Sequence, residues 1–349
     1  MGASVCASTP AGRRKRRTSS SASPPCARTK RTSAGTSPDR KGVSLRVRAT
    51  VRGLWHARSC FPASRVIPVP GAAPYIGVRH FTRGRAMPTQ IKNKEGTELF
   101  SHEGDLREAL EAAAAARVDL TKAVLDGADL SGMDLEDMNL RQVSLRGANL
   151  RGSNLANVNL AGANLHEAQL RGSDLERADM REVVLAGCNL EGCNLEGARL
   201  VGANLVGINA QGSNLESADL ARANLEGSNL EGCNLEDARL SEANLTRVNL
   251  RRSNLEDVDL NGANLTRADL RATNLEKADL RDCRLEGANF RDANLERVQF
   301  DRANLTNACF DYSNLERASF AAATLTGATF HNANLDRVKG FIPPEPEPP

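Results

Sequence analysis

Large apolar residues recur at every fifth position from about Val118 to Leu335, without insertion or deletion. If the central residue of each five-residue unit is numbered i, its 44 positions from Leu120 onward are Leu, Phe or Met, with the single exception of Ala210. Position i−1 is usually Asn or Asp, and position i−2 is Ala, Ser, Cys, Thr or Val; the exceptions at i−2 are Met133, Met138 and Ile208. A fixed internal period of this kind is the signature of a repeat architecture.

A period of five fits neither the alternation of a strand nor the 3.6-residue turn of a helix. It requires a chain that turns once in every unit. If each unit supplies one short strand and one corner, four units close a square coil with i and i−2 pointing inward. Successive coils then stack about 4.8 Å apart, and each backbone pairs with the coils on either side. The pattern predicts an all-β solenoid of about 11 coils of this spacing.

Two further features agree with stacked, filled coils. Pro is absent between Pro88 and Pro343, as backbone pairing requires, because Pro removes a hydrogen-bond donor. The small Ala210 follows the large Ile208 within one unit, so we expect the pair to conserve volume and the coil interior to contain no cavity.

The pattern Ala-(Asp/Asn)-Leu-x-x, as in Ala218-Asp219-Leu220 and Ala263-Asn264-Leu265, resembles that of the pentapeptide-repeat family. The resemblance covers about 220 of the 349 residues. It implies a right-handed quadrilateral β-helix. It indicates the fold far better than the function, because one fold serves many functions.

The ends of an open solenoid need covers, since they expose strand edges and an apolar layer. Residues 105–117 predict a helix with an apolar side that covers the first coil, and residues 90–101 predict a small hairpin before it. Toward the other end Phe replaces Leu at i, at Phe290, Phe300, Phe310, Phe320 and Phe330. We therefore divide the patterned chain into a hairpin and capping helix (87–117), a β-helix (118–338) and a Pro-rich tail (339–349).

Residues 1–86 differ in kind from the rest. They contain 18 Lys and Arg but one acid, Asp39, so the residues from Met87 onward carry about 14 excess negative charges. Such a segment, rich in Arg and Ser and without apolar periodicity, is expected to be disordered. Three interpretations stay open: an organellar transit peptide, a nucleic-acid-binding arm, or a start assigned too early. The beginning of patterned sequence directly after Met87 favours the last.

Motifs for chemistry are missing from the sequence. It contains no P-loop, GxSxG or HExxH, and its eight cysteines form no CxxC pair or zinc spacing. We predict no enzyme activity, no cofactor and no metal site. Reduced structural thiols favour the cytoplasm, with an organelle as the alternative if residues 1–86 are a transit peptide. No apolar run reaches the roughly 18 residues of a membrane span.

One face of the predicted square is acidic. On the face of Leu135 to Leu335, position i+1 is an acid in ten of eleven coils. Between Glu196 and Glu256 no base follows at i+2. The candidate partner-binding stripe is Glu176, Glu196, Glu216, Glu236, Asp237, Glu256, Asp257 and Glu276. The alternative is duplication of a 20-residue unit whose Glu merely keeps the surface solvated.

The sequence favours a non-catalytic surface that binds or scaffolds a protein partner, of basic character if the stripe is the contact. No direct nucleic-acid binding is expected from the solenoid, and the sequence does not specify an oligomeric state. The resemblance implies an alternative, because some pentapeptide-repeat relatives protect DNA gyrase as acidic rods that imitate DNA. Those relatives have a C-terminal dimerisation helix or interrupting loops, whereas here the coils are unbroken.

Overall fold

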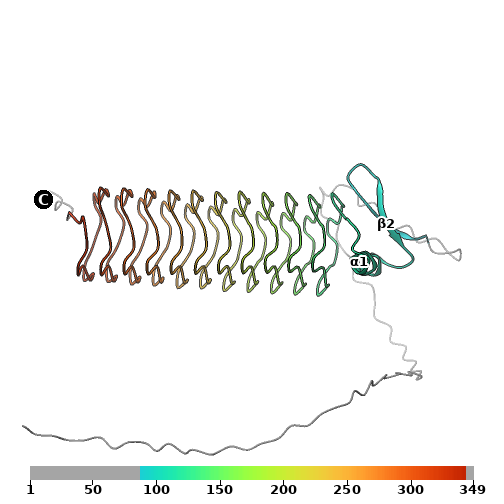
Figure 1. Ribbon diagram of the computed structural model, residues 1–349, viewed down its shortest axis with the longest axis horizontal. Coiled ribbons are helices and arrows are strands. Elements are labelled where there is room, and N and C mark those ends of the chain that lie inside the picture. Colours follow the sequence, from blue (N-terminus) through green and yellow to red (C-terminus); the bar gives the residue numbers. More distant parts are fainter. Residues whose placement is uncertain (1–86, 343–349) are drawn as a thin grey trace, which may run out of the picture. The chain divides into compact units, whose positions relative to one another are not determined.

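The computed structural model describes residues 87–342. A hairpin and a short helix precede a stack of coils that runs to the end of the described range (Figure 1). The interpretations given above for residues 1–86, and for the tail beyond residue 342, fall outside the described residues.

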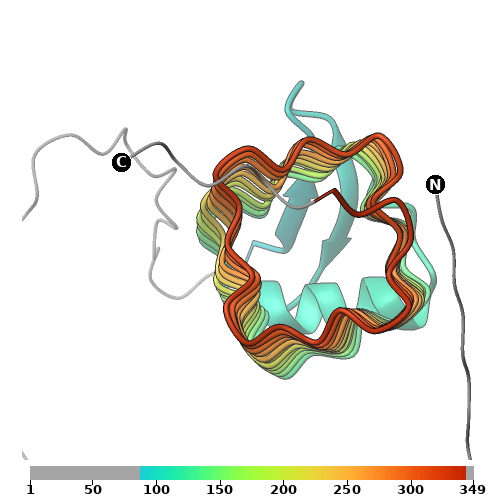
Figure 2. The same cartoon turned by 90° about the vertical axis from the view of Figure 1, so that its left-hand side faces the viewer.

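Each coil is square and lies in register with its neighbours (Figure 2). The residue at i−1 pairs in parallel with the residue twenty positions later, from Val124 with Ser144 to Ser319 with Lys339. The central residue donates its N–H to the next coil, as Leu135 does to the carbonyl of Asn154 at 2.8 Å. The predicted all-β solenoid with quadrilateral coils is confirmed.

Every corner is made by the i+2 residue in a left-handed conformation. Gly212 has φ 67° there, and Asp237 occupies the equivalent corner with φ 57°. Gly adopts this conformation without a steric penalty, whereas other residues accept strain to place a side chain at the corner. The corners are therefore where the chain can exchange a bare backbone for a projecting charged side chain.

The side chains at i and i−2 fill the interior of the coils. Toward the C-terminal end the core consists of two columns of stacked rings, with Phe290, Phe310 and Phe330 in one column. Successive rings in that column lie 4.9 Å apart between centroids. Phe300 and Phe320 form the second column at 5.0 Å and meet the first edge to face. Phe341 packs on the last rings and closes this end.

Ile208 was expected nearly to make up for the volume missing at Ala210, but the interior is not entirely without a cavity. A small void of about 10 Å³ remains beside Ala210, lined only by apolar side chains. Ile208 contributes to its wall, but its branched side chain projects from i−2 and does not reproduce a Leu at i. A void of this size with no polar lining stays dry.

The N-terminal cover consists of the predicted hairpin and helix. Strands β1 (Thr89–Lys92) and β2 (Glu98–His102) pair antiparallel. Helix α1 (Leu106–Ala115) begins with a capping box between Asp105 and Glu108 and buries Ala109, Leu110 and Ala113. The end of β1 is hydrogen-bonded to the first coil, where the N–H of Val124 donates to the carbonyl of Lys92 at 2.9 Å.

Candidate functional site

Asparagine side chains form a continuous column beneath the acidic face. From Asn214 to Asn334 each donates its amide to the Asn one coil earlier, as Asn234 does to Asn214 at 3.2 Å and Asn254 to Asn234 at 3.2 Å. The side-chain oxygen of the same Asn accepts the main-chain N–H of the following Glu, at 3.3 Å for Glu236. The residue at i−1 therefore orients the acidic residue at i+1.

A second polar column lies behind the asparagines, inside the core. Ser213 and Ser253 donate their hydroxyls to the carbonyls of Leu190 and Leu230 at 2.6 and 2.7 Å. Cys193 and Cys233 make the equivalent bond with their thiols. Because burial raises the pKa of each of these two thiols to about 11, they stay protonated and unreactive.

The Glu carboxylates have one oxygen held and one oxygen facing outward. Asn234 and Asn254 donate their amides to Oε2 of Glu216 and Glu236, each at 3.0 Å. The same contact reaches Glu196 from Asn214 and Glu256 from Asn274, each at 3.4 Å. Half-buried and held in this way, the carboxylates form a fixed row, with Oε1 of each directed away from the Asn that holds Oε2.

Bases take the outward oxygen at both ends of the stripe. Arg177 lies 2.7 Å from Oε1 of Glu176. Lys277 contacts Oε1 of Glu256 at 2.9 Å and Asp257 at 3.1 Å, and it also lies 3.7 Å from Glu276. Hydrogen bonding to Lys277 and its positive charge hold the pKa of Glu256 below its ordinary value.

Glu196, Glu216 and Glu236 differ from these neighbours. Within residues 87–342 no Lys, Arg or His lies within ion-pair distance of them or of Asp237. The sequence had suggested that the unpaired stretch extends to Glu256, and that is wrong, because Lys277 reaches back one coil. Of the eight candidate residues, these four are therefore the ones that the structure leaves without a base.

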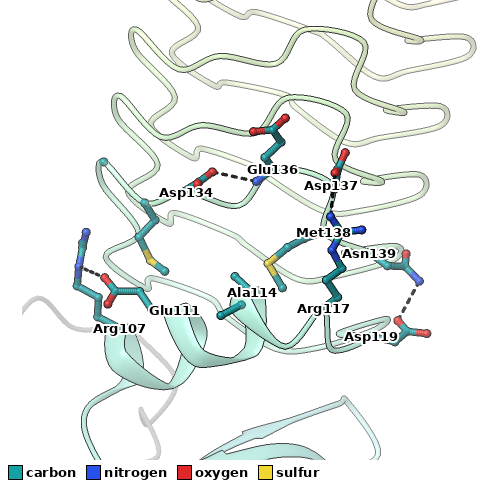
Figure 3. Close-up of a pocket in the computed structure, with 13 residues that line it drawn as sticks. Arg107, Glu111, Ala114, Arg117, Asp119, Asp134, Glu136, Asp137, Met138 and Asn139 are labelled. Carbon is teal, nitrogen blue, oxygen red and sulfur yellow. Dashed lines mark hydrogen bonds and ion pairs between the residues drawn. The ribbon is translucent and has the colours of Figure 1, made fainter. Parts of the chain in front are cut away.

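A groove at the N-terminal end of the solenoid was not anticipated from the sequence. It has a volume of about 790 Å³ and lies between the end of α1 and the units around Met133 and Met138 (Figure 3). Both Met residues break the small-residue rule at i−2, which was the one available signal. The sequence predicted that the helix covers the first coil, but the space left between the two depends on how closely they pack, which no spacing in the sequence records.

In the described part of the chain, the remaining candidate side chains are not grouped into a catalytic or metal-binding site. His166 accompanies Glu167, and His331 contacts Asp311, on separate coils. Among residues 87–342 no three His, Cys, Asp or Glu side chains are grouped to hold a metal ion. Nor does that range include a helix with the length and apolarity needed to cross a bilayer.

Comparison with known families matches most of the solenoid. A model described as "Pentapeptide repeats (8 copies)" matches residues 109–142, 139–177, 178–216 and 310–339, and one described as "Pentapeptide repeat region" matches residues 233–310. A search of curated proteins found no match.

Among solved structures, HetL of the cyanobacterium Nostoc is 30% identical over 66% of this chain and 95% of its own, with a TM-score of 0.32. HetL is described as a regulator of heterocyst differentiation. A pentapeptide repeat protein of the Arabidopsis thaliana thylakoid lumen is 32% identical over 27% of this chain and 70% of its own, with a TM-score of 0.23. The fluoroquinolone resistance protein QnrB1 is 15% identical over 60% of this chain and 92% of its own, with a TM-score of 0.24.

Proposed function

The chain belongs to the pentapeptide-repeat family, whose fold is the right-handed quadrilateral β-helix, and on that premise we propose that it is a non-catalytic binding module. Its contact surface is the central acidic face formed by Glu196, Glu216, Glu236 and Asp237. Its partner is a protein that presents basic side chains at matching intervals along one edge.

This proposal rests on one observation. On three successive coils the outward Oε1 of the Glu has no base within ion-pair distance among residues 87–342. The same column further along is bridged by bases, from Lys277 onward. An exposed ion pair contributes only about 0–1 kcal/mol, so single contacts would bind weakly. Three carboxylates repeated at the coil spacing of about 4.8 Å allow several such contacts to add along one rigid line.

The asparagine column supports recognition by fixing the row before a partner arrives. A side chain that is already oriented loses less conformational entropy on binding, and that loss is about 0.5–1.5 kcal/mol for a flexible side chain. Each Glu of the row is held through its Oε2 and through its main-chain N–H. A preorganised row therefore favours a specific partner over scattered surface acids.

The test compares two triple variants of the full chain in affinity capture from extract of the source cell, read by quantitative mass spectrometry. The first carries Glu196→Gln, Glu216→Gln and Glu236→Gln, and the matched control carries Glu276→Gln, Glu296→Gln and Glu316→Gln. Gln keeps an oxygen for the Asn amide, so the column stays intact. We expect the partner to be lost from the first variant alone. Equal recovery with both would reject the acidic face as the contact.

The gyrase alternative rests on the acidic surface that the described residues present. It is tested by a gyrase supercoiling assay with the full chain at micromolar concentration. If the chain neither inhibits supercoiling nor protects gyrase from a fluoroquinolone, the alternative is eliminated. The unbroken coils between residues 118 and 338 offer no loop of the kind that the gyrase-protecting relatives carry, which is why we prefer a protein-binding role.

A further inference from the structure

The first coil has an unpaired backbone edge. In the regular coils the residue at i−1 donates its N–H to the preceding coil, as Asn154 does to the carbonyl of Met133 at 2.8 Å. Carbonyls at i−1 and i+1 accept from that preceding coil, as those of Asn154 and Ala156 do from Leu135 and Asp137. Each coil therefore needs a neighbour on its N-terminal side to satisfy one donor and two acceptors in every unit.

The unit Met133–Asp137 lacks that neighbour. Within residues 87–342 the N–H and carbonyl of Asp134 and the carbonyl of Glu136 have no hydrogen-bond partner. Continuing the repeat backwards would bring the N–H of Arg117 to the carbonyl of Glu136. Instead, Arg117 donates to Ala114 at 2.9 Å and ends α1. The helix thus leaves the edge of this unit open.

The molecule already pairs the same edge two units earlier, on the opposite side of the square coil. There the N–H of Val124 donates to the carbonyl of Lys92, and Asn93 bridges to Ala123 in antiparallel fashion. An extended segment is therefore compatible with this side of the first coil. The hairpin stops at that position and does not reach the unit of Asp134.

The open edge borders the groove of about 790 Å³ between α1 and the first coil (Figure 3). Its accessible apolar surface comes from Ala114 and Ala115 on the helix side, whereas Met133 and Met138 lie buried beneath it. The groove therefore has room and apolar contact for a second segment beside the coil.

The charge of the groove selects the occupant. Five carboxylates line it, against two guanidinium groups: Glu111, Asp119, Asp134, Glu136 and Asp137 against Arg107 and Arg117. Both bases are already engaged, because Arg107 lies 3.1 Å from Glu111 and Arg117 lies 3.6 Å from Asp137. Hydrogen bonds from Thr121 lower the pKa of Asp119, which keeps that carboxylate charged. A Lys or Arg stem packed on Ala114 and Ala115, with its cation directed to Asp134 and Glu136, fits both the apolar contact and the charge.

We propose that an extended, Lys- or Arg-bearing segment of a partner protein adds as a strand to the open edge at Asp134–Glu136, within the groove under α1. Main-chain hydrogen bonds supply affinity in this mode, and side-chain pockets supply specificity. The site uses none of the residues of the central acidic face. The two sites can therefore be tested separately, and either can be rejected without rejecting the other.

The probe is a fluorescent octapeptide of alternating Lys and Val, titrated into the full chain and followed by anisotropy. A twin with N-methyl groups on alternate amides keeps every side chain but cannot pair along one edge. We expect the unmodified peptide to bind. The twin whose N-methyl groups lie on the edge that would pair with the coil should bind at least tenfold more weakly. Equal binding of the two would overturn strand addition, and no binding of either would overturn the site.

Two pairs of variants locate the binding. Ala115→Trp fills the groove and is expected to weaken binding at least tenfold, whereas Ala116→Trp, on the same helix end but outside the groove lining, leaves it unchanged. Asp134→Asn with Glu136→Gln should weaken it roughly threefold to tenfold, as loss of two exposed ion pairs implies. Glu196→Gln with Glu216→Gln should have no effect. The reverse ranking in either pair would reject the groove.

Hydrogen exchange of the Asp134 amide gives a further readout. If this edge had only a structural role, adding the peptide would not change its exchange rate. In the free chain this amide should exchange as fast as an unpaired one, and the peptide should slow it. The bonded amide of Asn154, at the same position of the next coil, should not change. An Asp134 amide that is already protected in the free chain would overturn the proposal, because another part of this chain or a second copy would then occupy the edge.

Discussion

The central coils and the C-terminal coils share one backbone but differ in both core and surface. Around Ala210 the core contains a Leu-lined void, and among residues 87–342 no base lies within ion-pair distance of Glu196, Glu216 or Glu236. From Phe290 onward the core is a stack of rings, and bases from Lys277 to Arg337 bridge the same acidic column. Since every coil pairs in the same way, core and surface can vary separately without altering the path of the chain.

This difference suggests a division of labour along the rod. In a solenoid the stability is approximately a sum over coils and their interfaces with nearest neighbours. Stacked rings and bridged acids stabilise the C-terminal coils, whereas the central coils present charge that a partner can use. Four sets of variants can break or sharpen this comparison.

The largest effect is expected in the ring column. Phe310→Ala removes stacking on Phe290 and Phe330 and should cost about 3–5 kcal/mol of unfolding free energy. Leu230→Ala, at the equivalent position of the central coils, should cost about 1 kcal/mol less, since its neighbourhood already contains the void. Urea denaturation of the two variants measures the difference. An equal or larger loss for Leu230→Ala would remove the contrast between the two cores.

The void provides the next test, through a double-mutant cycle. Ala210→Leu should destabilise by about 1–3 kcal/mol, because the void is too small for three more carbon atoms beside Ile208. Ile208→Ala should cost about 2–5 kcal/mol by enlarging the void. The double variant restores the repeat pattern and should unfold close to the wild type. Simple additivity of the two losses would show that Ile208 and Ala210 do not share a space.

The asparagine column should respond equally in both regions. Asn234→Ala removes the bonds to Asn214 and Glu216 of the coil before, and Asn314→Ala removes the bond to Asn294. Each also leaves the amide of the next Asn short of one partner. Each should cost about 1–3 kcal/mol, the usual consequence of a half-buried polar group left unsatisfied. Denaturation curves of the two proteins should coincide. A much larger loss at Asn314 would mean that the bridging bases, and not the column, hold the Glu row.

The smallest effect is expected from exchanging the surface charges. Ser217 and Lys277 occupy equivalent left-handed corners, with φ of 55° and 62°, so Lys277→Ser opens a bridge and Ser217→Lys creates one to Glu196. The first should lower and the second raise the melting temperature slightly at low salt. High salt should abolish both shifts, because it screens exposed charges. Shifts that persist in high salt would point to backbone strain at the corner instead.

The pH dependence of that exchange follows from Glu256. Its pKa in the folded protein lies below the ordinary value of 4.5, so the bridge to Lys277 stabilises the fold fully above pH 4.5. The stabilisation fades as the pH falls through the lowered folded pKa. The difference in melting temperature between wild type and Lys277→Ser should therefore be present at neutral pH and vanish in strong acid.

The fold could be predicted because its cause is local and repeated. A large residue at i and a small one at i−2 in every unit dictate which side chains point inward, and the absence of Pro permits pairing throughout. The cap helix followed from the apolar residues that share one side of residues 105–117, of which Ala109, Leu110 and Ala113 are buried. The acidic column also followed from the period, since residues twenty positions apart must lie on one face.

Contacts between coils were harder to predict. The bridge from Lys277 back to Glu256 joins residues 21 positions apart, and it depends on which way a long corner side chain leans. That contact reduces the unpaired acids to Glu196, Glu216, Glu236 and Asp237. The ion-pair geometry, and not the composition, decided which carboxylates of the stripe have no base within ion-pair distance among residues 87–342.

The amino-acid sequence alone determined the square coil, its four faces and the covered N-terminal end, because each is fixed by residue type at a constant spacing. Only the tertiary structure decided the void beside Ala210, the free carboxylates and the open edge at Asp134. The void remains because side chains of different shape pack imperfectly. The open edge exists because α1 takes the N–H of Arg117 for its own last turn, a competition between two backbone partners that no spacing in the sequence records.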